Sequence, residues 1–308
     1  MRDILEPQQI AASASTPPYL ELPPATLFAQ RAERLRALAP GHQLQAFLYL
    51  VADLCDVQQS LLDQPPAAPM PAPDRLVLCQ QHGLPPLAFD SLVREGAWQP
   101  WLDAFLDRYA TAGTPKVQQA LHRLRTAPAD QRLVWALAQL SGNYAALPAN
   151  IVPFLGAALQ VAWTHWLLHL PNPALKPGAS LSQCPGCGSP AMAGVIRQRG
   201  AHNGLRYLVC SLCACQWHVV RVKCVYCEES KGLDYVSLVT DRHPPEQAPL
   251  RAETCHLCQL FLKLLYLEHD SGAEALSADL ASLALDMCLD DDGFNRLAPN
   301  LMLSPGGG

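Results

Sequence analysis

The chain has 308 residues, of which 50% are hydrophobic and 16% are charged, and its formal net charge is −5. This much apolar material excludes a wholly disordered chain, and the negative net charge argues against a protein that coats nucleic acid. The length suggests about two domains, and the 28 prolines divide the apolar material into short pieces.

The first 24 residues are rich in Pro, Ala and Ser, and we expect them to form a flexible tail. They contain neither an apolar run of about 7–15 residues nor an Arg-Arg pair, so they do not resemble a Sec or Tat export signal. We therefore expect a cytoplasmic protein. In that reducing compartment, paired cysteines are metal ligands or redox thiols more often than disulfides.

Residues 25–170 show the spacing of apolar side chains that is typical of helices and almost no period-two alternation. We interpret this region as one all-helical domain. The proline-rich run at 65–73 cannot be helical and is expected to be extended. The predicted helices are Leu27–Ala39, Gln43–Leu62, Ser91–Ala110, Pro115–Arg125, Ala129–Leu140 and Ile151–Leu170.

One predicted helix is long and apolar enough to span a membrane. Residues 133–175 contain no Asp, Glu, Lys or Arg, and 151–170 has the length of a membrane span. However, Pro153, Gln160 and His165 interrupt the span, and no cluster of positive charge anchors either end. We therefore predict a buried core helix and no membrane insertion.

Residues 171–183 are rich in Pro, Gly and Ser and are interpreted as a linker. Beyond them, short runs with strand character lie between turn residues, at Leu205–Val209, Trp217–Val222 and Tyr235–Val239. The spacing of apolar residues predicts a C-terminal helix over Glu274–Cys288.

Ten of the 12 cysteines lie in the last 125 residues, and eight of these ten form four C-x-x-C pairs. In such a pair, a tight turn points both sulfurs at one ion, and two pairs complete a tetrahedral shell of four sulfurs. The eight candidate metal ligands are Cys184, Cys187, Cys210, Cys213, Cys224, Cys227, Cys255 and Cys258.

We favour sequential pairing of these motifs, with one site formed by the pairs at 184 and 210 and a second by the pairs at 224 and 255; interleaved pairing is the alternative.

The resulting fold is α+β and multidomain. An all-helical N-terminal domain precedes two tandem small rubredoxin-like or zinc-ribbon β modules, at 184–222 and 223–308, and a C-terminal helix ends the second. Modules this small need the metal for their stability.

Four-sulfur sites suit zinc or a single iron ion, and spacing alone does not separate the two metals. Either way the protein fills the coordination shell, whereas hydrolytic zinc needs an open position. We find no catalytic constellation elsewhere in the sequence and expect a protein that is not an enzyme. Cys215 does not fit either site and is interpreted as a bystander.

Two other functions are open at this point. A nucleic-acid-binding zinc ribbon is favoured by five basic residues among 184–227, namely Arg197, Arg199, Arg206, Arg221 and Lys223, although the net charge argues against it. A thiol oxidoreductase would need a C-x-x-C pair with a low-pKa thiol that binds no metal.

The run GLRYLVCSLCACQWHVVRVKCVYCE, at 204–228, resembles the hallmark of the FdhE family of formate dehydrogenase accessory proteins. The segments CPGCGSPAMAGV, KGLDYVSL, RAETCHLCQLFLKLLY and ADLASLALD extend the likeness, which is dense from Cys184 to Asp286. The last pair, CHLCQ, lacks the glycine that follows Cys187, which leaves its turn geometry open.

The resemblance implies a cytoplasmic maturation factor that is required for active formate dehydrogenase. It implies iron in two rubredoxin-like sites, with zinc as the alternative metal. It also implies that the partner is the catalytic subunit of formate dehydrogenase, bound before export. The negative net charge leads us to expect that nucleic acid is not bound. Self-association stays open.

Overall fold

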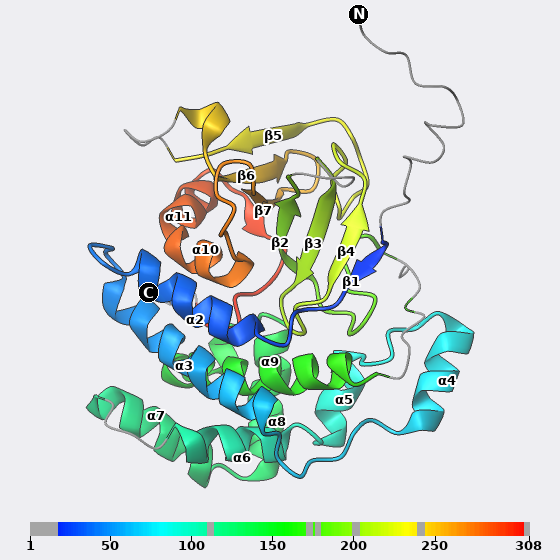
Figure 1. Ribbon diagram of the computed structural model, residues 1–308, viewed down its shortest axis with the longest axis vertical. Helices are drawn as coiled ribbons and strands as arrows, with labels where there is room; N and C mark the ends of the chain where they lie inside the picture. Colours follow the sequence, from blue (N-terminus) through cyan, green and yellow to red (C-terminus); the bar gives the residue numbers. More distant parts are fainter. Residues whose placement is uncertain are drawn as a thin grey trace, which may run out of the picture.

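The computed structural model describes residues 18–109, 114–170, 175, 180–198, 204–238 and 244–304. Most of the predicted flexible tail and of the predicted linker 171–183 lies outside these residues. Within them, the helices of the first half of the chain gather in the lower part of the view, and a twisted sheet lies above them with two C-terminal helices beside it (Figure 1).

Eight α-helices are described in the first part of the chain. They are α2 (Leu27–Leu38), α3 (Gln45–Asp63), α4 (Pro73–His82), α5 (Phe89–Glu95), α6 (Gln99–Arg108), α7 (Pro115–Thr126), α8 (Ala129–Leu140) and α9 (Val152–Leu168). Short 3-10 turns at Tyr144–Ala146 and Ala149–Ile151 precede α9. The helical N-terminal half predicted from the sequence is confirmed.

Two local predictions in this half were wrong. The single helix expected over Ser91–Ala110 is divided, because Gly96 ends α5 in the left-handed conformation with φ 78°. The first part, α5, also begins two residues before Ser91, at Phe89. Helix α4 was not predicted, since its first residue is Pro73 at the end of the proline-rich run, a position where proline is well tolerated.

Helix α9 forms the centre of the helical half. The segment Ala149–Leu168 is long and apolar enough to span a membrane, but 94% of its most apolar window is buried inside the protein. Gly156 allows a close approach, because a Cβ atom there would lie 1.8 Å from the carbonyl oxygen of Leu301. The Gln139 side chain bridges the same two segments, donating to the carbonyls of Val152 and Leu301 at 2.8 Å.

The two cysteine-rich segments have the same order of parts: a C-x-x-C pair, two strands, a second pair and a third strand. The first contains β2 (Ala191–Ile196), β3 (Arg206–Cys210) and β4 (Gln216–Val219). The second contains β5 (Leu233–Val236), β6 (Leu250–Cys255) and β7 (Leu260–Tyr266).

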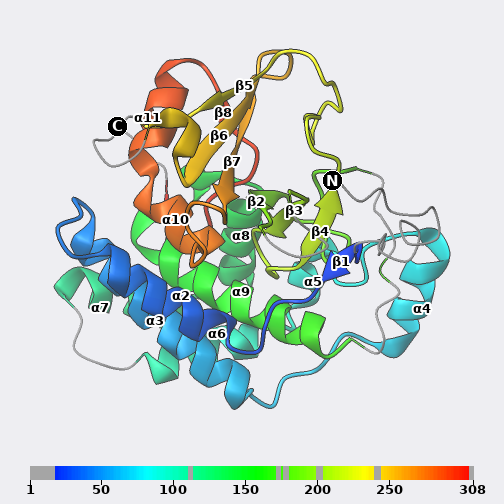
Figure 2. The ribbon, with the colours of Figure 1, turned by 45° about the horizontal axis from the view of Figure 1, so that its top comes forward.

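Parallel pairing of β2 with β7 joins these modules into one sheet with the order β1-β4-β3-β2-β7-β6-β5, and β8 (Asn295–Arg296) pairs with β7. The β7–β8 pair is parallel as well, and the remaining neighbours are antiparallel. The sequence indicated two separate small modules and did not indicate this shared sheet. Figure 2 shows the strands of both modules forming one continuous layer above the helices.

Part of the predicted flexible tail is a strand. Leu20–Glu21 forms β1, which pairs with β4 so that Leu20 lies opposite Trp217. The Tyr207 hydroxyl also donates to the carbonyl of Pro18 at 2.8 Å. The flexible-tail prediction was therefore wrong for residues 18–24. A strand of two residues is too short to show alternation in the sequence, and it forms only because β4 offers its free edge for pairing.

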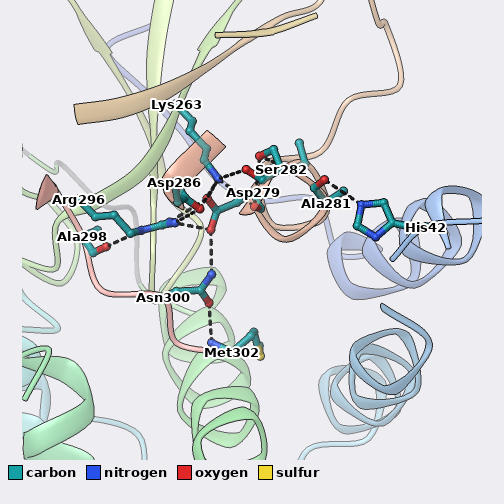
Figure 3. Close-up of polar contacts among 11 residues, drawn as sticks. His42, Lys263, Asp279, Ala281, Ser282, Asp286, Arg296, Ala298, Asn300 and Met302 are labelled. Carbon is teal, nitrogen blue, oxygen red and sulfur yellow. Dashed lines mark hydrogen bonds and ion pairs between the residues drawn. The ribbon is translucent and has the colours of Figure 1, made fainter. Parts of the chain in front are cut away.

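The predicted C-terminal helix is present as two short helices, α10 (Ala275–Ala281) and α11 (Leu283–Asp291), separated at Ser282. A buried network of charges fixes them to the sheet (Figure 3). The ammonium group of Lys263 on β7 lies 3.0 Å from Asp279 and 2.7 Å from Asp286, and Arg296 on β8 reaches both carboxylates. Opposite charges balance in this network, as burial requires.

Candidate metal centres

The eight cysteines of the C-x-x-C pairs form two groups of four, each with all sulfur atoms within 4.8 Å of one another. Centre 1 contains Cys184, Cys187, Cys210 and Cys213, and centre 2 contains Cys224, Cys227, Cys255 and Cys258. This is the sequential grouping that we favoured over the interleaved one.

The sulfur–sulfur distances fit a metal site and not disulfides. They are 3.6 Å for Cys184–Cys213 and 3.4 Å for Cys187–Cys210 in centre 1, and 3.7 Å for Cys224–Cys258 and 3.6 Å for Cys227–Cys255 in centre 2. A disulfide needs about 2.05 Å, whereas a tetrahedron with metal–sulfur bonds of about 2.3 Å has edges of about 3.8 Å. Both donor sets therefore fit zinc or iron.

The residue after the second cysteine of every pair has a left-handed backbone. The φ values are 77° at Gly188, 56° at Ala214, 63° at Glu228 and 56° at Gln259. Three of these residues also donate their backbone N–H to the carbonyl of the first cysteine in their pair, at 2.8–3.0 Å. The missing glycine in the last pair therefore does not change its turn, and Gln259 accepts a conformation that glycine adopts more easily.

Backbone N–H groups of the turns point at the sulfur atoms. Gly186 donates to the sulfur of Cys184 at 3.3 Å, and Leu212 donates to that of Cys210 at 3.4 Å. In centre 2, the N–H groups of Tyr226 and Leu257 approach the first cysteine of their pairs in the same way. Such bonds stabilise thiolates and orient them toward a shared ion.

Centre 1 lies inside the main hydrophobic core, with all four cysteines buried. The first C-x-x-C turn of centre 1 is hydrogen-bonded to the start of α5 and the loop before it. The N–H groups of Leu87 and Phe89 donate to the carbonyls of Gly186 and Cys187 at 2.9 and 3.0 Å. From α9, the Gln160 amide donates to the carbonyl of Ser211 at 2.8 Å. The helical half therefore holds both turns of centre 1.

Centre 2 lies nearer the surface. Cys227 and Cys258 are partly exposed, and the neighbouring Tyr226 and Leu257 are 58% and 60% exposed. Beside this centre, the His256 ring lies 2.9 Å from the carboxylate of Asp234 on β5. A small separate core formed by residues of β6, β7, α11 and Phe294 supports this module.

The thiols of centre 1 influence one another strongly. Burial is the main reason that the pKa values of Cys184, Cys210 and Cys213 lie well above the ordinary cysteine value. Burial acts on Cys187 as well, but hydrogen bonds from the other three thiols outweigh it and hold the pKa of Cys187 well below that value. Four thiols this close cannot all ionise by themselves, because like charges repel; a divalent cation removes that obstacle.

A fifth thiol lies against centre 1. Cys215 is fully buried, and after burial itself its proximity is one of the influences that raise the pKa of Cys184. This agrees with the interpretation of Cys215 as a bystander outside both sets of ligands. Its closeness to centre 1 could not be predicted from spacing, because the direction of its side chain depends on how the chain enters β4. Of the remaining cysteines, Cys55 and Cys79 are buried, whereas Cys288 on α11 is exposed.

Comparison with known families gives three adjoining matches. The model described as FdhE, N-terminal, matches residues 16–180, the FdhE central domain matches 183–221, and the FdhE C-terminal domain matches 222–303.

Curated relatives and a solved structure agree with these matches. The chain is 61% identical to the protein named FdhE homolog of Pseudomonas putida, over 99% of this chain and 96% of that protein. It is 41% identical to the FdhE homolog of Edwardsiella ictaluri, over 91% and 89%. The crystal structure of the FdhE protein from Pseudomonas aeruginosa superimposes with a TM-score of 0.89 at 57% identity, covering 94% of this chain and 100% of that chain.

Proposed function

The chain belongs to the FdhE family, and from this premise we propose that it is a cytoplasmic accessory protein required to form active formate dehydrogenase. It binds the catalytic subunit of that enzyme before export, and it catalyses no reaction of its own. Its eight paired cysteines hold one metal ion in each centre, and that metal is iron.

The observation that carries this proposal is that both centres are sets of four convergent thiols. A shell completed by four protein sulfurs leaves no position for a substrate or an activated water molecule, which is what hydrolytic metal sites require. Such a shell supports a protein that binds and presents rather than one that hydrolyses.

The donor set fits iron and zinc equally well. Either metal, when bound, would have a structural role, because it would link the two C-x-x-C turns of its centre. Iron would allow a second role, the transfer of a single electron. The N–H groups directed at the sulfurs of both centres support the second role, because hydrogen bonds to sulfur adjust the reduction potential of sulfur-bound iron. Centre 2 is the centre in which two of the four cysteines are partly exposed, which favours it as the one that a partner protein would approach.

Metal analysis of protein purified without oxygen tests the identity of the ions. We expect two iron ions per chain and the optical absorption of sulfur-bound ferric iron after mild oxidation. Two zinc ions per chain in protein that fully supports formate dehydrogenase would contradict the proposal for iron and leave a structural role for the metals.

A second experiment tests the role in maturation. A bacterial strain that lacks its own FdhE protein is supplied with the wild-type chain, with Cys227→Ser/Cys258→Ser or with Cys288→Ser. We expect the double variant to lose formate dehydrogenase activity and co-purification with the catalytic subunit. The matched control Cys288→Ser removes an exposed thiol outside both centres and should behave as wild type.

A further inference from the structure

A hollow of about 400 Å³ lies on the face of the sheet where the two modules meet. Its lining comes from β2 and β3 of the first module, from β5, β6 and β7 of the second, and from the connection between the modules. The lining residues that carry the argument are Arg206, Arg221, Val222, Tyr235, Arg251 and Tyr266.

The charges in this hollow are not balanced. Arg206 and Glu253 form a buried two-pronged ion pair at 2.8 and 3.0 Å, with side chains that are 0% and 5% exposed. That pair is neutral as a whole. Arg221 and Arg251 remain, and in the part of the chain that the structure describes neither has a carboxylate within 4.0 Å. The hollow therefore has two positive charges that ion pairing does not neutralise.

Both unpaired arginines are held in place by contacts that leave their charge available. The guanidinium of Arg251 lies 4.2 Å from the centre of the Tyr266 ring and donates to the carbonyls of Ala248 and Glu246. Arg221 donates to the carbonyl of Gly204 at 3.3 Å. Because backbone carbonyls and an aromatic ring restrict these side chains without neutralising them, less conformational entropy is lost when an anion binds.

The connection between the modules adds a strained apolar residue to the rim. Val222 has φ 64° and is 58% exposed. A β-branched residue is seldom found in this conformation, and strain of this kind is concentrated at functional sites. Val220 nearby is 65% exposed, so apolar side chains are presented to solvent beside the two cations.

We propose that this hollow binds a small organic anion, namely a carboxylate or phosphate group attached to an aromatic or apolar body. Arg221 and Arg251 bind the oxyanion through charge-assisted hydrogen bonds. Val222, Tyr235 and the aliphatic lining cover the apolar body. The volume lies at the lower end of the range for small-molecule sites, about 300–1,000 Å³.

Because the lining comes from both modules, the ligand stabilises their arrangement. The buried pair on the floor joins β3 to β6, and Arg206 also donates to the carbonyl of Lys223, the residue before Cys224. The site thus lies next to the start of centre 2. The proposal does not depend on the role in maturation, since binding is measured on the purified chain alone.

The test is isothermal titration of the metal-loaded full chain at low ionic strength with four probes. Phenyl phosphate and benzoate combine a ring with an oxyanion, inorganic phosphate has charge alone, and benzyl alcohol has a ring alone. We expect a Kd of roughly 1 mM or tighter for phenyl phosphate or benzoate. Inorganic phosphate should bind at least about tenfold more weakly, benzyl alcohol should not bind, and added salt should weaken binding. The stronger of the two aromatic anions identifies the phosphate or the carboxylate as the preferred group.

Substitutions locate the site. Arg221→Ala/Arg251→Ala should weaken binding of the better probe by roughly 100-fold, since each charge-assisted contact contributes about tenfold. Lys231→Ala is the matched control, because it removes one exposed positive charge from the same module outside the hollow. Metal content and thermal unfolding should be unchanged in both variants, which separates lost binding from lost folding.

Two results would overturn the proposal. One is that neither phenyl phosphate nor benzoate binds below 10 mM, a limit about tenfold above the expected value. The other is that the double arginine variant binds them as well as the Lys231→Ala control does. Loss of formate dehydrogenase maturation in a variant that still binds the anion bears on the proposed function alone.

Discussion

In centre 1 all four cysteines are buried within the main core, whereas in centre 2 two of the four are partly exposed beside exposed Tyr226 and Leu257. The turns are alike, and every pair is followed by a left-handed residue. What differs is the support: the loop before α5 and helix α9 hydrogen-bond to the turns of centre 1, while centre 2 relies on a small core of its own. The same local motif is therefore fully buried in one place and partly exposed in the other.

The largest expected effect is the loss of centre 1. Metal binding contributes about 10–16 kcal/mol to the folding of small zinc modules, which exceeds the total stability of many domains. Cys187→Ser/Cys210→Ser should therefore prevent cooperative folding of the helical half as well. Cys227→Ser/Cys255→Ser should lose one metal ion per chain and retain the helical circular dichroism and most of the Tm.

These outcomes are read from metal content, circular dichroism and thermal melts, with Cys288→Ser as the control. Equal destabilisation by the two double variants would show that the difference in burial has no energetic consequence.

The next effect concerns the seam between the modules. Arg206→Met leaves the Glu253 carboxylate buried without its partner, and removal of one member of such a pair costs about 3–5 kcal/mol. The double variant Arg206→Met/Glu253→Met should recover most of that loss, because no charge is then left buried. Urea denaturation of the metal-loaded protein gives the comparison. A loss below about 1 kcal/mol for the single variant would show that the modules are not coupled through this pair.

A pH effect should arise in the helical support of centre 1. Burial, with a further contribution from the charge of His169, lowers the pKa of His165 to about 4 from the ordinary 6.5. The unfolded chain thus binds a proton at His165 before the folded chain does, so stability is present above pH 6.5 and falls as the pH drops toward 4. We expect a loss of about 2 kcal/mol between pH 7 and pH 5.

The His165→Gln variant isolates this contribution, because acid release of metal affects the variant and the wild type alike. The stability difference between the two proteins should change with pH, and it should stay constant for the exposed control His122→Gln. A pH-independent difference for His165→Gln would mean that this ring does not titrate between the folded and unfolded states.

The smallest effect concerns the turns. Gly188→Ala places a side chain at φ 77° in centre 1 and should cost about 1 kcal/mol. Gln259→Gly removes a side chain at φ 56° in centre 2 and should raise stability by up to about 1 kcal/mol. Chemical denaturation of both variants measures the two changes. Destabilisation by Gln259→Gly would show that the hydrogen bond from its amide to the carbonyl of His256 matters more than the backbone conformation.

Much of the fold and of the site could be predicted because it depends on local spacing. The two cysteines of each pair could be assigned to one site from the C-x-x-C motif, since one tight turn aligns both of its sulfurs regardless of what surrounds it. The core position of α9 could be inferred from a long uncharged stretch interrupted by polar groups. By contrast, β1 is two residues long, and α4 begins at a proline; neither has a periodic pattern of its own.

The sequence by itself determined which two cysteines share each turn, which half is helical and which helix is apolar enough for the core, because each of these leaves a local pattern of spacing in the chain. It favoured the sequential grouping of the turns without excluding the interleaved one. Only the tertiary structure decided that β2 and β7 join the modules into one sheet, that Cys215 lies against centre 1, and that centre 1 is buried while centre 2 is partly exposed. Those features depend on pairings between residues far apart in the chain. Spacing within a motif contains no information about the partner that a distant strand or helix will meet.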